Sequence, residues 1–186
     1  MKTTIRLLAA PLCALLVLAA AAAPAGAGAP VAPDDVEGPV TWGAVRNVTR
    51  LDQLWFAGQP DRAGLEAARA AGIEVVINLR APWELRWDER SAVEALGMSY
   101  YNVPVTGRSF DPKAFARVEE LVSQNRGKEI LIHCASSTRA GGWLATHLVR
   151  ERGMSVDDAL AVGRRTGISG WGTVSQVHAF LGNAER

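Results

Sequence analysis

Short apolar runs alternate with amphipathic segments along most of the chain. Runs rich in β-branched and aromatic residues cover 45–49, 55–57, 73–79, 99–105 and 130–132, which is the pattern of short, buried strands. Segments with helical spacing are expected after Asp61, over 91–96, after Asp111, from Arg139, from 155 and after Thr173. This alternation predicts an α/β domain with a central, largely parallel sheet flanked by helices, and ligands at the carboxyl ends of its strands.

The start of the chain has the pattern of a secretory signal. Lys2 and Arg6 give it a charged start, an apolar run covers 7–23, and small residues at 25–27 fit a signal-peptidase site. We therefore expect a signal peptide over 1–27, a flexible linker over 28–40 and one domain over 41–186, in a secreted or periplasmic protein. An uncleaved run would instead be a membrane anchor.

Cleavage would remove Cys13 and leave Cys134 as the single cysteine of the mature protein. An unpaired thiol in an oxidising compartment is a liability unless it has a chemical role. The formal net charge is +1 without a basic stripe, which gives nucleic-acid binding little support. No residues have metal-ligand spacing, so neither a metal nor another cofactor is expected. We expect a monomer with a small anionic or phosphorylated substrate, in contact with a membrane only through an uncleaved signal segment.

The stretch over 129–142 carries the clearest chemistry. An apolar strand ends at Cys134, and small polar residues lead into a helix that opens at Arg139. The positive end of a helix and a nearby guanidinium both stabilise a thiolate. The anion cradle would consist of Ala135, Ser136, Ser137, Thr138 and Arg139. The alternative is structural, a small buried cysteine followed by a capping run, but the arginine at the helix mouth favours a nucleophile.

Four motifs follow one another in a characteristic order. They read FAGQP at 56–60, VINLR at 76–80, YNVPV at 101–105 and HCASSTR at 133–139. Together they resemble the dual-specificity-like cysteine-dependent protein phosphatases, and more closely the bacterial beta-lactamase-hydrolase-like, phosphatase-like domains. The resemblance implies a three-layer α/β fold and metal-free hydrolysis of phosphomonoesters through a phosphocysteine at Cys134. It also implies that Arg139 and the loop amides clamp the phosphoryl oxygens.

Two other functions stay open. Cys134 and Arg139 enclose four residues where the common phosphatase signature has five, and a loop of this length resembles that of rhodanese-like sulfurtransferases, whose thiolate carries a persulfide. The hydroxyl residue that usually follows the arginine is Ala140, and the usual loop glycine is Ser137. These departures fit a third possibility, a non-catalytic anion-binding domain.

A phosphatase also needs a general acid for the leaving group. Asp111 is the main candidate, although an aspartate before Pro112 is also a typical helix cap. Asp88 and Glu84 are weaker candidates for the acid. Arg80 either lines the pocket or pairs with Glu84 four residues later.

The remaining candidates are expected to support the site or to line its rim. His133 should point to the opposite strand face from Cys134, bond to backbone and hold the loop. Arg108 could attract an anion, although a solvated surface arginine is the simpler expectation. Trp83 and Trp87 lie in a predicted loop near the site and could face an aromatic substrate.

Overall fold

The computed structural model describes residues 30–106 and 110–184. Its described strands form a six-stranded sheet in the order β1-β2-β3-β6-β4-β5. The strands are β1 (Glu37–Trp42), β2 (Val45–Leu51), β3 (Leu54–Ala57), β4 (Ile73–Asn78), β5 (Ser99–Asn102) and β6 (Glu129–His133). The last four of the spatial order, β3, β6, β4 and β5, are parallel, whereas β1 and β2 form an antiparallel extension at one edge. The predicted α/β class and largely parallel sheet are confirmed.

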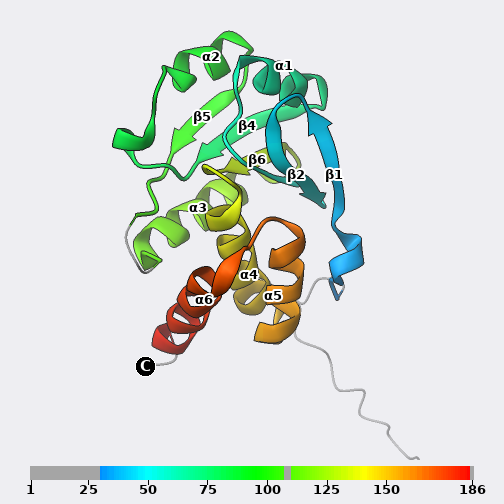
Figure 1. The fold of residues 1–186 in the computed structure, drawn as a ribbon, viewed down its shortest axis with the longest axis vertical. Helices are drawn as coiled ribbons and strands as arrows, with labels where there is room; N and C mark the ends of the chain where they lie inside the picture. The colour runs from blue at the N-terminus through cyan, green and yellow to red at the C-terminus, as the bar shows by residue number, and fades with distance from the viewer. Residues whose placement is uncertain (1–29, 107–109, 185–186) are drawn as a thin grey trace, which may run out of the picture.

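Helices cover both faces of the sheet (Figure 1). They are α1 (Arg62–Ala70), α2 (Glu89–Ala95), α3 (Pro112–Gln124), α4 (Thr138–Arg152), α5 (Val156–Arg165) and α6 (Gly170–Ala184), with short 3-10 helices η1 (Pro33–Asp35) and η2 (Pro82–Glu84). The sheet has a hydrophobic core on each face. Alternate residues of β6 belong to different cores, because successive strand side chains point to opposite faces. Ile130 and Ile132 pack in the cluster with α3 to α6, and Leu131 packs in the cluster with α1 and α2. No helix in the described part of the chain combines the length and apolarity that a membrane span needs.

Strand β6 lies at the centre of the parallel part, and this position brings the cysteine motif to the middle of the sheet. Leu131 is in register with Trp55 of β3 on one side and with Val76 of β4 on the other. All three strands end at the same edge. The segments that follow them, including the FAGQP, VINLR and HCASSTR motifs, therefore meet at the carboxyl edge of the sheet, where ligands of such folds bind.

The domain begins earlier than the sequence predicts. Val36 is only 3 % exposed, and β1 begins at Glu37 and pairs with β2. Residues 37–40 of the expected linker belong to β1, so that part of the prediction is wrong. Gly38 and Pro39 are uncommon inside strands, which is why the sequence does not indicate this strand at the sheet edge. The last helix also begins at Gly170 and not after Thr173. The expected signal peptide over 1–27 lies outside the described residues.

Candidate active site

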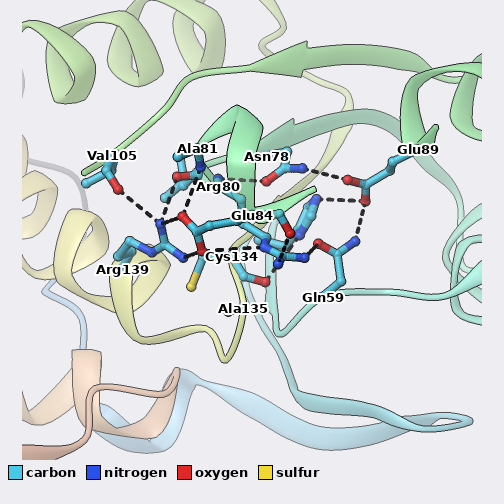
Figure 2. Close-up of polar contacts among 12 residues, drawn as sticks. Gln59, Asn78, Arg80, Ala81, Glu84, Glu89, Val105, Cys134, Ala135 and Arg139 are labelled. Atoms are coloured by element: carbon cyan, nitrogen blue, oxygen red, sulfur yellow. Dashed lines mark hydrogen bonds and ion pairs between the residues drawn. The ribbon is translucent and has the colours of Figure 1, made fainter. Parts of the chain in front are cut away.

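Cys134 lies immediately after β6, at the carboxyl edge of the sheet (Figure 2). Its amide donates to the carbonyl of Ala57 at 3.3 Å, which continues the ladder between β6 and β3 by one residue. The residue is 1 % exposed and its thiol is free. The sulfur is thus at the floor of the site, at the point where the parallel strands end and the loops begin.

The loop after Cys134 turns its carbonyl groups toward β2 and the segment after β3. The carbonyl of Ala135 accepts from the backbone N–H of Gln59 at 3.3 Å, and the carbonyl of Ser136 accepts from the side-chain Nδ2 of Asn47 at 2.9 Å. Ser137 has a left-handed backbone, with φ of 71°. Within the described residues, the amides of Ala135 and Ser136 donate to no protein acceptor, while an antiparallel bridge between Ser136 and Gly58 holds the loop against the segment after β3. Consecutive open amides at such a turn, followed by a helix N-terminus, form a concavity suited to an anion.

Two hydroxyl groups of the loop, those of Ser137 and Thr138, bond to a neighbouring segment of the chain. Ser137 is fully buried and its Oγ donates to the carbonyl of Thr166 at 2.6 Å, while Thr138 Oγ1 donates to that of Gly167 at 3.0 Å. A Cβ on Gly167 would lie 2.7 Å from Ser137 Cβ, so only glycine permits this approach. The two side chains tie the loop to the connection between α5 and α6, while the Ser136 hydroxyl lies 3.2 Å from Thr138 Oγ1.

Arg139, in the first turn of α4, is fixed by a carboxylate from another part of the chain. Its Nη1 and Nη2 donate to the two oxygens of Glu84 in η2, both at 2.7 Å. Nη1 also donates to the carbonyls of Val105 at 3.0 Å and Leu79 at 3.3 Å. This bidentate pair, shown in Figure 2, holds the guanidinium beside Cys134 rather than in solvent.

A count of donors shows which part of the Arg139 guanidinium can hold a ligand. A guanidinium has five N–H donors. The two on Nη1 and one on Nη2 are used by Glu84 and backbone carbonyls, and a further side-chain hydrogen bond of Arg139 goes to Cys134. Among the described residues, no oxygen accepts from the edge formed by Nε and the second Nη2 donor. That edge offers two parallel donors, the arrangement that matches a phosphoryl or carboxylate group.

The charges of this cluster are mutually stabilised. Hydrogen bonds from Arg139 lower the pKa of Glu84 from 4.5 to about 2, against the opposing effect of burial. Burial lowers the pKa of Arg139, but the bonds to Glu84 and the interaction with Cys134 outweigh it and leave that pKa raised. Arg80 Nε lies 3.6 Å from Glu84, which confirms the predicted pair. A carboxylate with so low a pKa holds no proton near neutral pH, so Glu84 is excluded as the general acid.

The two aspartates proposed from the sequence as acids both cap helices. Asp111 is exposed, and its Oδ1 accepts from the Lys113 amide at 2.9 Å at the start of α3. Asp88 accepts from the Ser91 amide at 3.0 Å and from its hydroxyl at 2.6 Å, and these bonds lower its pKa. The capping alternative for Asp111 is confirmed, and its role as general acid stays a prediction. Arg108 lies outside the described residues.

The sequence did not single out two carboxylates that the structure places around the site. The sequence offered Glu84 as an acid or as a partner of Arg80, not as the partner of Arg139, and it gave Glu89 no role. Glu89 is 2 % exposed and lies 3.1 Å from Nε2 of His133, the residue before the nucleophile. His133 Nδ1 contacts the Cys134 carbonyl at 3.4 Å, as the expected contact with backbone requires. Neither partner is signalled locally, because each lies more than 40 residues from the group it binds.

The tryptophans near the site have different environments. Trp83 is 79 % exposed and adjoins Glu84, so it can line the rim of the site. Trp87 is half-buried against the core that packs with α1 and α2, and the guanidinium of Arg62 lies over its ring, 5.2 Å from the ring centroid. Of the two, Trp83 alone is free to meet a substrate. The described residues also contain no group of three or more His, Cys, Asp or Glu side chains that could hold a metal ion.

Known proteins resemble this chain in sequence over a part and in fold over most of it. No family model matches. The "Beta-lactamase hydrolase-like protein" of Agrobacterium fabrum (strain C58) is 30% identical over 94 residues, which are 48% of this chain and only 22% of that protein. The Tk-PTP structure has a TM-score of 0.63 at 22% identity and covers 77% of this chain and 99% of its own.

A P. aeruginosa TpbA variant in complex with pTyr has a TM-score of 0.59 at 17% identity, over 84% of this chain and 88% of its own. Likeness at such identities concerns the fold alone, that is, the arrangement of strands and helices. The chain thus has the fold of the tyrosine and dual-specificity phosphatase-like proteins.

Proposed function

We propose that the protein is a cysteine-dependent, phosphatase-like hydrolase of phosphomonoesters. One observation carries the proposal: Cys134, the open amides of the loop and the open edge of the Arg139 guanidinium meet at the carboxyl edge of the sheet. A dianionic phosphoryl group needs several N–H donors directed at its oxygens and a nucleophile opposite the leaving group. These residues supply both.

The proposed reaction has two steps. In the first, the Cys134 thiolate attacks phosphorus, an S–P bond forms, and the P–O bond to the leaving group breaks. The departing alkoxide or phenoxide takes a proton from the Asp111 carboxyl group. In the second, water gives a proton to the Asp111 carboxylate while its oxygen attacks phosphorus. The S–P bond breaks, and phosphate and the thiolate are released.

Release of phosphate from an aryl phosphate between pH 5 and 7.5 tests this function. Turnover should fall to background in Cys134→Ser, and by about 10²–10³-fold or more in Arg139→Ala, because the developing charge loses its clamp. Arg117→Ala is the matched control, since that arginine pairs with Glu120 on the exposed face of α3 and should not affect turnover. A mass gain of one phosphoryl group on the Cys134 peptide after acid quenching would identify the intermediate. Turnover no higher than in Cys134→Ser would reject the proposal.

The four-residue loop favours a second candidate, a sulfurtransferase that uses a persulfide on the same sulfur. The two functions differ in the atom that Cys134 carries. Transfer from thiosulfate to cyanide, with a mass gain of one sulfur on the Cys134 peptide, would select this candidate. Phosphate binding without either turnover would select the non-catalytic anion-binding domain.

We also propose that the protein is exported. The support is the charged start, the apolar run over 7–23 and the small residues at 25–27. N-terminal sequencing of the protein recovered outside the cytoplasm should find a start at Gly28. A start at Met1 in a membrane fraction would indicate an uncleaved anchor instead.

A further inference from the structure

Strand β2 contains a bulge at Arg46 and Asn47. The residues on either side, Val45 and Val48, pair with residues of β1 that are only two positions apart, so two residues of β2 lie opposite one residue of β1. Both valines are buried in the same core, although residues three apart in a regular strand point to opposite faces. The bulge thus leaves Arg46 and Asn47 together outside the core, and bulges beside functional sites commonly redirect side chains in this way.

The two residues of the bulge contact the carbonyl groups of the cysteine loop. Asn47 Nδ2 donates to the carbonyl of Ser136 at 2.9 Å, and Arg46 Nη2 lies 3.5 Å from that of Ala135. Gly58 of the FAGQP motif lies between bulge and loop, and its N–H donates to the Arg46 carbonyl at 2.8 Å. A Cβ on Gly58 would lie 3.2 Å from the carbonyl oxygens of both Arg46 and Ala135, so a glycine favours this close approach.

The residue after Ser136 has a strained backbone. Ser137 has a φ of 71°, in the left-handed region that is unfavourable for a residue with a side chain. A rotation of the planar peptide between Ser136 and Ser137 by about half a turn would bring that φ to the negative values that serine prefers. The same rotation would reverse the directions of the C=O and N–H of this peptide. The strain at Ser137 therefore favours a different loop, unless the Ser136 carbonyl is held in place.

Other contacts of the loop hold different atoms. The Ser137 hydroxyl donates to the carbonyl of Thr166, and the bridge to Gly58 holds Ser136 through the backbone of its neighbours. In the part of the chain that the structure describes, Asn47 alone gives the Ser136 carbonyl a side-chain donor. The bond lies at an exposed position, where water can replace the amide if the side chain is removed. Its loss should therefore change the loop more than it changes the stability of the fold.

We propose that Asn47 is a positioning residue that locks the peptide between Ser136 and Ser137 in the orientation that binds the anion. The bulge presents the Asn47 side chain, and its amide holds the Ser136 carbonyl against the strain at Ser137. Strained backbone persists only where surrounding groups fix it, and it occurs preferentially at ligand sites. The inference deepens the proposed function and rests on it for the identity of the anion, a phosphoryl group.

Binding of inorganic phosphate, measured by calorimetry, tests the proposal without turnover. Asn47→Gly keeps the left-handed backbone of the bulge, where φ is 54°, and removes only the amide. Phosphate affinity should fall by about three- to tenfold, the factor that corresponds to one hydrogen bond. Asp52→Gly is the matched control, because Asp52 is exposed, has the same φ of 54° and pairs with Arg152 rather than with the loop. Its phosphate affinity should equal that of the wild type, and the two variants should unfold at similar urea concentrations.

Ser137→Gly provides a background in which the lock is unnecessary, because glycine adopts a positive φ without strain. In that background Asn47→Gly should change phosphate affinity by less than about twofold, since the effects of coupled residues are not additive. Unchanged affinity in Asn47→Gly, an equal loss in both backgrounds, or a wild type that does not bind phosphate would overturn the proposal. A wild type that binds phosphate through this lock but hydrolyses no phosphomonoester would reject the phosphatase and retain the inference.

Discussion

Helices α3 and α4 begin in opposite ways. At α3, Asp111 accepts from the Lys113 amide and Pro112 contributes no N–H, so the first turn is satisfied by its own sequence. At α4, Ser137 stands in the cap position, but its hydroxyl donates to Thr166 and gives the helix no side-chain cap. The α3 terminus is closed, whereas the α4 terminus keeps its amides for a ligand.

The other capped helices extend this contrast. Asp61, Asp88 and Ser155 cap α1, α2 and α5, each through an amide three residues later. At the start of α4 the carboxylate comes instead from Glu84, which is distant in the sequence. Glu84 binds the side chain of Arg139 and leaves the amides of the helix without a cap. Departure from a local rule that the same chain follows elsewhere is typical of a functional site.

Asp111 allows the two roles of a helix-start aspartate to be separated. Asparagine caps about as well as aspartate but cannot donate a carboxyl proton, so Asp111→Asn should keep its stability and lose about 10²-fold in kcat on an alkyl phosphate. The loss should be smaller on an aryl phosphate with a good leaving group. Asp111→Ala should lose about 1 kcal/mol of stability as well. Unchanged kcat in Asp111→Asn would show that this residue is only a cap.

The parts of the molecule that the sequence predicts are those whose cause is local. The strand before Cys134, the helix opened by Arg139 and the caps at Asp61 and Asp111 all follow from neighbouring residues. Glu84 was not predicted as the partner of Arg139, because 55 positions separate them and only the folded sheet brings their loops together.

Strand β1 was missed for a different reason. It contains Gly38 and Pro39, and all of its residues before Trp42 are exposed, so it has no hydrophobic alternation. Its existence depends on pairing with β2, as in the contact of Val40 with Val48. A strand that is defined by its partner rather than by its own burial leaves no period in the sequence.

The cap positions of α4 and α5 offer a comparison of stability. Ser137→Ala leaves the buried Thr166 carbonyl without its donor, so the free energy of unfolding should fall by about 1–3 kcal/mol. Ser155→Ala removes an exposed cap and should cost about 1 kcal/mol or less. Urea unfolding measures both. Phosphatase turnover should fall only in Ser137→Ala, because that bond holds the loop. Equal losses of turnover would contradict the assignment of the loop anchor.

The ion pair between Glu84 and Arg139 at the start of α4 should make the free energy of unfolding depend on pH. The pKa of Glu84 is about 2 in the folded protein and 4.5 ordinarily, so below pH 4.5 the unfolded chain binds a proton that the folded protein does not. The contribution to stability is therefore complete above pH 4.5 and is lost as pH falls toward about 2.

Urea unfolding of wild type and Glu84→Gln should accordingly give a stability difference that is constant from pH 7 to about 5 and shrinks toward pH 2.5. Glu74→Gln is the control for the loss of one carboxylate, because Glu74 is the one exposed residue of β4. A difference that stays constant to pH 2.5 would mean that the Arg139 pair does not form in solution. The start of α4 would then lack Glu84 as the partner that distinguishes it from the start of α3, because Glu84 would no longer hold the guanidinium of Arg139 at the loop.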